Sequence, residues 1–172
     1  KIDESSRTFK ERTMYTSGRV EQKLVEIYGK NWKPKLRKNR QLAHTFSVNQ
    51  EQLAKAQKAF DANPTPETQE KLDEAIDNSE KIYTQNQMSY LYNQHKDPSN
   101  DGAFEKMYGP QYKEILSEIE KALTPEVKAF ADWQVSELFP ELYEHYNEVY
   151  KKIYHTNMPW NEFYAGRIYR DG

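Results

Sequence analysis

The chain has 172 residues, of which 36% are hydrophobic, and its mean hydropathy is −1.09. It carries 25 basic and 27 acidic side chains, thirteen Tyr and no Cys, which excludes disulfides, thiolate nucleophiles and Cys-ligated metal sites in this chain. No apolar run approaches the ~18 residues of a membrane-spanning helix, so we expect no membrane span.

The N-terminal half is predicted to be helical, with breaks at Gly and Pro. Apolar residues at helical spacing predict a helix over residues 8–28 that Gly29 ends. Residues 30–48 are basic and aromatic, and we expect a turn and a short helix there. Asn49 has the character of an N-cap, and Gln52 stands three residues later in the capping-box position.

The next break is the sequence Asn63-Pro64-Thr65-Pro66, in which Thr65 suits an N-cap and Pro66 suits a first helical residue. The following helix is expected to run to about residue 95. Residues 53–95 would then form a polar helical hairpin.

The C-terminal half continues in the same way. Residues 95–102 are expected to form a turn, and residues 103–108 a short helix that Gly109 and Pro110 end. Another helix is predicted over residues 112–123. Thr124 and Pro125 then begin the longest periodic segment, residues 125–155, which Pro140 must kink or split.

These elements predict an all-α fold, an extended bundle of about five to seven helices with an irregular aromatic C-terminal tail. We expect a basic N-terminal helix and connector over residues 1–48 and a polar helical hairpin over residues 49–96. A group of helices that includes the kinked one follows over residues 97–155, and an extended tail over residues 156–172. Because the chain starts at Lys1 and stops at Gly172 just after an aromatic stretch, we expect a fragment of a larger polypeptide.

Charge is unevenly distributed, with 12 basic and 5 acidic side chains in residues 1–44 against 13 and 22 in the remainder. The densest basic run is a candidate contact for nucleic acid or another partner: Lys30, Trp32, Lys33, Lys35, Arg37, Lys38 and Arg40. Its cations can neutralise phosphates and its indole can stack on a base. Docking onto the acidic part of this chain or onto an acidic neighbour explains the run equally well.

Tyrosines recur at steps of three and four residues in the last predicted helix, at Tyr143, Tyr146, Tyr150 and Tyr154. Such a stripe is typical of ordinary helix packing with the hydroxyl groups at the rim. It would pack on the hairpin of this chain or on another subunit, and it is the candidate assembly surface.

Two patterns resemble metal sites, and each has a simpler interpretation. Asp97-x-Ser99-x-Asp101-Gly102 starts like a calcium loop, but Tyr108 stands where the bidentate Glu should be, so we expect a turn. Glu141, Glu144, His145 and Glu148 lie within two helical turns without a partner motif, so we expect a solvated acidic face. We find no catalytic motif, and expect no enzyme activity, cofactor or metal within this chain.

A succession of short motifs in the C-terminal half carries a family resemblance. Residues 88–109 lead into Leu123-Thr124-Pro125-Glu126, then Phe139-Pro140, then Tyr146-Asn147-Glu148-Val149-Tyr150, then Met158-Pro159-Trp160. This order and spacing resemble a helical segment of very large polyvalent proteins of tailed bacteriophages, which are packaged in the virion and delivered with the genome. Met158 replaces a leucine of that pattern, and Tyr164 falls in its expected place.

The resemblance covers about residues 80–165 and carries over no catalytic residue. It implies a non-enzymatic structural portion of a virion protein, in the particle interior or its ejection path and in the host cytoplasm after delivery. The implied partners are portal or internal virion proteins, or further copies or segments of the same chain. Two alternatives stay open: a nucleic-acid-binding or antirestriction module that uses residues 30–40, and a helical fragment of a larger virion-packaged enzyme.

Overall fold

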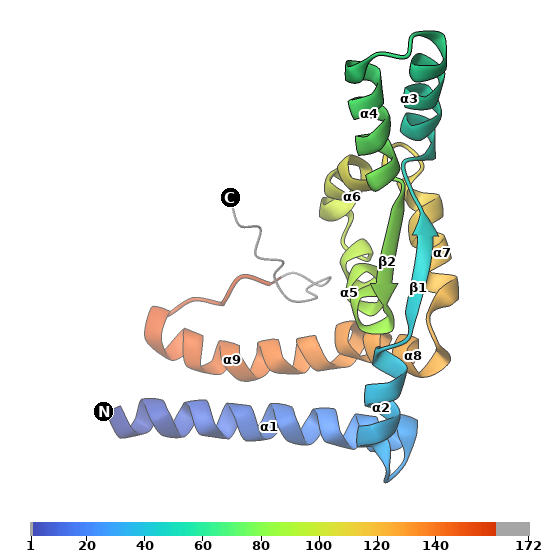
Figure 1. Cartoon of the computed structure of the whole chain (residues 1–172). Helices are drawn as coiled ribbons and strands as arrows, with labels where there is room; N and C mark the ends of the chain where they lie inside the picture. Colours follow the sequence, from blue (N-terminus) through green and yellow to red (C-terminus); the bar gives the residue numbers. More distant parts are fainter. Residues whose placement is uncertain (1, 161–172) are drawn as a thin grey trace. The chain divides into compact units, whose positions relative to one another are not determined.

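A computed structural model describes residues 2–160, with side chains from residue 15 onward (Figure 1). It is 76% helical with a small two-stranded sheet, so the predicted mainly α-helical class is confirmed. The α-helices are α1 (Ile2–Tyr28), α2 (Trp32–Arg40), α3 (Gln50–Ala62), α4 (Pro66–Asp77), α5 (Gln85–His95), α6 (Asp101–Tyr108), α7 (Tyr112–Ala122), α8 (Pro125–Trp133) and α9 (Phe139–Tyr154). The other elements are β1 (Ala43–Ser47), β2 (Glu80–Thr84), the 3₁₀-helix η1 (Pro98–Asn100) and the π-helical segment η2 (Gln134–Leu138).

The chain divides into two compact units. The terminal unit combines the described parts of residues 1–40 and 124–172, and the central unit is the contiguous segment 41–123. These boundaries differ from the four segments expected from the sequence, because the two ends of the chain share one core. Of the predicted aromatic tail, residues 161–172, which include Tyr164, lie outside the described residues.

In the terminal unit, a largely aromatic core joins α1 to α8 and η2. The buried members of this core are Leu24, Tyr28, Phe130, Trp133 and Leu138. The α1 helix ends at Tyr28, as predicted, because Gly29 adopts a positive φ of 88° that other residues rarely tolerate. The Lys35 ammonium then donates to the free carbonyl oxygen of Tyr28 at 3.2 Å.

The predicted long segment over residues 125–155 is helical without a break from Pro125 to Tyr154, and the interruption expected from its Pro takes the form of a π-helical stretch. The Thr124 hydroxyl accepts a hydrogen bond from the amide of Val127, and Pro125 begins α8. The five-residue π-helical segment η2 follows, and Pro140 is the second residue of α9. Pro140 has no amide hydrogen to donate to the preceding turn. The π-helical stretch changes the hydrogen-bond spacing just before it from i→i−4 to i→i−5, so the helix continues past the proline.

The central unit is built on a two-stranded antiparallel ribbon that the sequence analysis missed. β1 and β2 pair from Ala43 opposite Thr84 to Ser47 opposite Glu80. The prediction of one helix to residue 95 was therefore wrong, because α4 ends at Asp77 and the chain becomes extended. Thr84 then starts α5 with a complete capping box, in which its hydroxyl accepts from the amide of Gln87.

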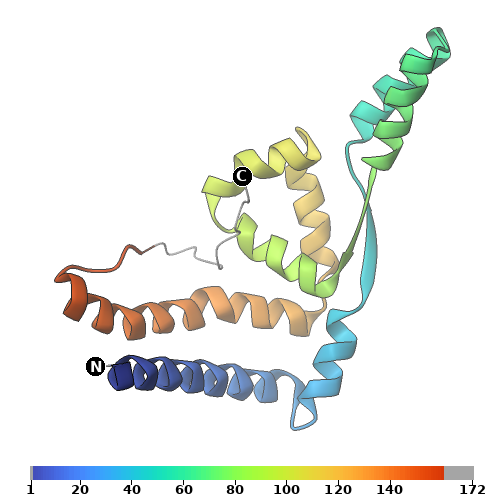
Figure 2. The same ribbon diagram turned by 60° about the vertical axis from the view of Figure 1, so that its left-hand side comes forward.

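The α3–α4 helical hairpin is inserted between the two strands and extends from one end of the ribbon (Figure 2). Thr65 and Pro66 begin α4 as predicted, with a capping box completed by Thr68. Asn49 stands in the N-cap position of α3, as predicted, and its carbonyl oxygen accepts a hydrogen bond from the Leu53 amide at 3.1 Å. The predicted side-chain cap is absent, because the Asn49 backbone is left-handed, with φ of 52°, and its side chain makes no capping hydrogen bond.

In the central unit, α5, α6 and α7 pack together around apolar side chains and around the buried amides of Gln85, Asn93 and Gln94. Met88, Gln85 and Ile119 have no exposed surface, and Phe104 and Tyr108 are also buried. The Gln85 Nε2 donates to the Ala122 carbonyl oxygen at 2.7 Å and lies 2.9 Å from the His44 Nε2.

The two turns predicted in this region are present. The Asp97 carboxylate accepts a hydrogen bond from the amide of Ser99 at the start of η1, so this segment is a capped turn. The α6 helix ends at Tyr108, and Gly109 follows with a φ of 87°.

Candidate functional site

The basic run predicted from the sequence lies on and just before α2, and this helix has two distinct faces. Trp32 and Leu36 are half-buried and pack against the core of the terminal unit. On the same side, the Asn39 Nδ2 donates to the Tyr28 hydroxyl at 3.0 Å. Burial raises the pKa of that Tyr28 hydroxyl. One face of α2 is therefore fixed to the core.

Four cations form the opposite, solvent-facing side, which we call the cationic face: Lys30, Lys33, Arg37 and Lys38. Lys33 and Arg37 are four residues apart, so they lie on adjacent turns of one helix side. Within the part of the chain that the structure describes, none of the four pairs with a carboxylate.

The other members of the predicted run have structural contacts. The Lys35 ammonium donates a hydrogen bond to the Tyr28 carbonyl oxygen at the end of α1, and the Arg40 guanidinium lies 5.9 Å from the centroid of the Phe130 ring. Trp32 packs on the core, and the Lys33 ammonium lies 5.6 Å from its ring centroid. The sequence pattern found the cations but could not separate the solvent-facing four from the residues that hold the helix in place.

The tyrosines of the predicted stripe make different contacts. The Tyr143 hydroxyl donates to the Met158 carbonyl oxygen at 2.6 Å, and its ring lies 4.6 Å from that of Trp160. Tyr143 therefore holds the segment that follows α9. Tyr150 and Tyr154 contact each other with ring centroids 4.5 Å apart, and Tyr154 is 61% exposed.

Tyr146 is half-buried on α9, and its ring centroid lies 6.2 Å from that of His145 in an edge-to-face arrangement. The four tyrosines thus do not form one uniform surface. Only the end of the stripe, with Tyr154 and the equally exposed Ile153, presents a large apolar area to solvent.

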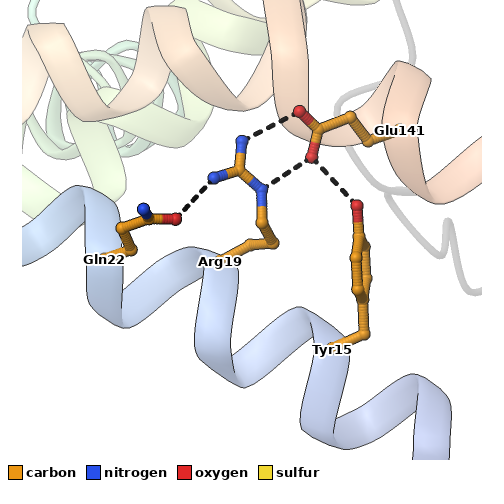
Figure 3. Close-up of polar contacts among 4 residues, drawn as sticks. All are labelled: Tyr15, Arg19, Gln22 and Glu141. Carbon is orange, nitrogen blue, oxygen red and sulfur yellow. Dashed lines mark hydrogen bonds and ion pairs between the residues drawn. The ribbon is translucent and has the colours of Figure 1, made fainter.

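A polar cluster links α1 to α9 within the terminal unit (Figure 3). The Arg19 guanidinium donates to both Glu141 carboxylate oxygens at 2.8 Å, and its third hydrogen bond, also 2.8 Å, goes to Gln22. The Tyr15 hydroxyl approaches the same carboxylate at 3.4 Å. The hydrogen bonds from Arg19 hold the pKa of the Glu141 carboxyl below its ordinary value.

This cluster corrects the prediction of a solvated acidic face for two of its four residues. Glu141 is paired with Arg19, and His145 stacks on Tyr15 at a centroid distance of 4.8 Å. Glu144 and Glu148 are exposed. No local pattern could identify the pairing, because Arg19 and Glu141 are 122 residues apart.

Residues 15–160 contain no group of three His, Asp or Glu side chains arranged to hold a metal ion. No helix in the described part of the chain is both long and apolar enough to cross a membrane.

Comparison with known proteins identifies no relative of this chain. The sequence matches no protein-family model, and neither a curated protein nor a solved structure matches it.

Proposed function

We propose that this chain is a non-enzymatic structural portion of a large virion protein of a tailed bacteriophage. It is carried inside the particle, where its partners are portal or internal virion proteins or further copies of the chain. The proposal rests on the motif succession in residues 80–165 and on the roles that those motifs have in the fold.

The observation that carries the proposal is a contact between two of the motifs. Asn147 belongs to the Tyr146–Tyr150 motif of α9, and Met158 opens the exit motif. The Asn147 Oδ1 accepts a hydrogen bond from the Met158 amide at 2.7 Å, while its Nδ2 donates to Asn157 at 3.2 Å. One motif thus fixes the direction in which the other leaves the helix, which is a structural role.

Other motif residues stand at junctions of the fold. Tyr108 is buried, and its hydroxyl lies 2.7 Å from that of Tyr83. Gly109 supplies the positive φ after α6, and Pro125 begins α8. Residues that end, cap and connect helices are what a structural segment requires, and this supports the proposal over a catalytic interpretation of the same motifs.

The test is mass spectrometry of purified particles from the native source, with peptide mapping across Lys1 and Gly172. We expect peptides of this chain in density-purified particles at a constant ratio to the portal protein, joined to flanking sequence of a very large polypeptide. Peptides confined to the soluble lysate, or absent from the particles, would contradict the proposal. An intact mass of about 20 kDa, the mass of this chain alone, would also contradict it.

The cationic face favours a second candidate function, the binding of nucleic acid. Four cations without a carboxylate partner among the described residues stand on one side of a helix that is fixed by its other side. This arrangement suits contacts to successive phosphates, and the release of counterions would drive binding without sequence preference. Trp32 packs on the core, so its indole does not stack on a base in this proposal, and the four cations alone make the contacts to nucleic acid.

Retention of a DNA duplex should test this candidate. Replacing Lys30, Lys33, Arg37 and Lys38 with Gln should abolish measurable binding. For the unaltered chain, the plot of log affinity against log salt should have a slope of about −3 to −4, as four phosphate contacts predict. The matched control replaces four exposed lysines elsewhere, Lys55, Lys58, Lys113 and Lys121, and should bind as before. Equal loss in both variants would exclude a specific role of the cationic face.

A further inference from the structure

A polar hollow of about 490 Å³ lies in the central unit where the base of the α3–α4 hairpin meets β2 and the end of α6. Its lining is mostly polar, with three lysines and three amide side chains. The lining residues are Asn49, Gln52, Ala56, Lys71, Glu74, Ala75, Asn78, Lys81, Lys106 and Met107.

Helical spacing brings these residues together from distant parts of the sequence. Lys71, Glu74, Ala75 and Asn78 follow the i, i+3, i+4, i+7 pattern, so one side of α4 forms one wall. Gln52 and Ala56 are four residues apart and form the facing wall on α3. Small side chains on both helices, Ala56 and Ala75, leave the space between the walls open.

Lys81 is held at the hollow by the register of the ribbon. It is paired with Phe46, whose side chain is buried, and it is half-buried itself. Paired residues point to the same face of a sheet, so Lys81 lies on the inner side of the ribbon. Its neighbour Ile82 points the other way and is 67% exposed.

The lining concentrates positive charge in an acidic part of the chain. Residues 41–123 hold eight basic and fourteen acidic side chains, yet three of the eight lysines line this one hollow with a single carboxylate, that of Glu74. Among the described residues, none of the ammonium groups of Lys71, Lys81 and Lys106 makes an ion pair. The hollow thus carries about two uncompensated positive charges.

Asn49, one of the lining residues, fixes the backbone around the hollow. Its left-handed backbone directs the side chain so that Nδ2 donates to the carbonyl oxygens of Asn78 at 3.0 Å and Met107 at 3.3 Å. The ends of α4 and α6 are thereby tied to the start of α3. A site that is formed before its ligand arrives loses less conformational entropy on binding.

We propose that this hollow binds a small phosphorylated organic molecule of the size of a nucleoside monophosphate. A phosphate monoester carries about −1.5 to −2 charges at neutral pH, which matches the uncompensated charge of the lining, whereas one carboxylate would neutralise only half of it. The volume falls within the usual range of small-molecule sites, so it accommodates more than inorganic phosphate. Met107, 45% exposed, supplies an apolar contact for the organic part.

The same chemistry is found in a free nucleotide and at the 5′-phosphorylated end of a nucleic acid. Isothermal titration of the full chain should therefore use adenosine 5′-monophosphate, adenosine, and a trinucleotide with and without a 5′-phosphate. We expect the monophosphate to bind and adenosine not to bind. A preference for the phosphorylated trinucleotide, with competition by the monophosphate, would identify a nucleic-acid end as the source. A preference for the monophosphate would identify a free small molecule.

Variants should assign the binding to the hollow. Lys71→Gln, Lys81→Gln and Lys106→Gln should each weaken binding of the monophosphate about three- to tenfold, and the triple variant should abolish it. Glu74→Gln should strengthen binding because it removes the only carboxylate of the lining. Lys58→Gln, on the same hairpin but outside the hollow, should leave the affinity unchanged, and so should the variant that neutralises the cationic face of α2.

Circular dichroism of each variant separates loss of the site from loss of the fold. Absence of heat for the monophosphate at millimolar concentration would overturn the proposal. An unchanged affinity in a folded triple variant, or equal weakening by Lys58→Gln, would also overturn it. These outcomes are independent of whether the chain is found in virions, so the structural role and the ligand site can fail separately.

Discussion

The two units of this chain reach stability in different ways. The terminal unit joins residues that are about a hundred positions apart, and large aromatic side chains such as Trp133 and Phe130 form its core. The central unit is one contiguous segment of short helices around a two-stranded ribbon, and its interior includes the buried amide of Gln85. An isolated two-stranded ribbon has only marginal stability in water. The helices that pack on one side of this ribbon therefore provide the apolar burial that stabilises it.

The units also differ in charge. The terminal unit has 17 basic and 13 acidic residues in its sequence segments, and the central unit has eight and fourteen. A chain with a net charge near −2 thus contains one basic and one acidic part. The comparison shows why whole-chain composition says little about partners here, since each unit presents its own field to solvent.

The largest effect is expected in the aromatic core of the terminal unit. Trp133 is 4% exposed and packs edge-to-face on Phe130 with ring centroids 5.6 Å apart. Trp133→Ala should lower the free energy of unfolding by about 3–5 kcal/mol because it leaves a large cavity. Hydrogen exchange should locate the loss of protection in α1 and α8. Trp160→Ala, at a 44% exposed position, is the control and should cost far less. Equal costs would contradict the assignment of the core.

A smaller effect is expected at the buried amide of the central unit. Gln85→Leu should destabilise the chain by about 1–3 kcal/mol, because the Ala122 carbonyl oxygen loses the hydrogen bond that the fully buried Gln85 amide donates. Chemical denaturation measures the change. Gln57→Ala, on the exposed side of α3, should change stability by less than about 0.5 kcal/mol. A stabilising Gln85→Leu would mean that the amide is retained for a reason other than stability.

Two glycines of the terminal unit should respond with opposite signs to the same substitution. Gly18 lies inside α1 with open space around the position of an added Cβ, so Gly18→Ala should stabilise by about 0.5–1 kcal/mol. Gly29 also has open space but a φ of 88°, so Gly29→Ala should destabilise by about 1 kcal/mol through backbone strain alone. Thermal unfolding of both variants measures the difference, and shifts of the same sign would refute the backbone explanation.

The smallest effect should come from the ion pair of Arg19 and Glu141, which is partly exposed. The pKa of Glu141 is lowered in the folded chain, so the pair contributes stability above the ordinary carboxyl pKa of 4.5 and loses it as the pH falls below that value. As the pH falls below 4.5, the free energy of unfolding should therefore decrease more in the unaltered chain than in Glu141→Gln. Identical pH profiles would show that the pair contributes nothing measurable.

Local rules predicted much of the fold from the sequence. Thr65 with Pro66, Thr124 with Pro125, and the glycines at 29 and 109 mark helix boundaries through capping and backbone geometry, which depend on a few adjacent residues. The π-helical interruption just before Pro140 follows from the missing amide of proline in the same way.

The ribbon and the interactions across the chain could not be predicted in this way. Ala43 pairs with Thr84 across 41 positions, and neither five-residue strand carries a strong alternating pattern of its own. The candidate sites show the same limit. The cationic face was found because its members are adjacent in sequence, whereas Lys71, Lys81 and Lys106 come together only through the fold.

The ribbon also has a consequence for how this chain tolerates change over evolutionary time. The Val48 amide donates to the Ser79 carbonyl oxygen at 2.8 Å, so the two ends of the α3–α4 hairpin lie next to each other at the end of the ribbon. A segment whose ends are neighbours can be lengthened, exchanged for another, or lost to a tight turn while the strands keep their register. The strand pairing therefore places few demands on the length of the hairpin, whereas its removal would also remove most of the lining of the hollow and the hydrogen bond from Asn49 to Met107.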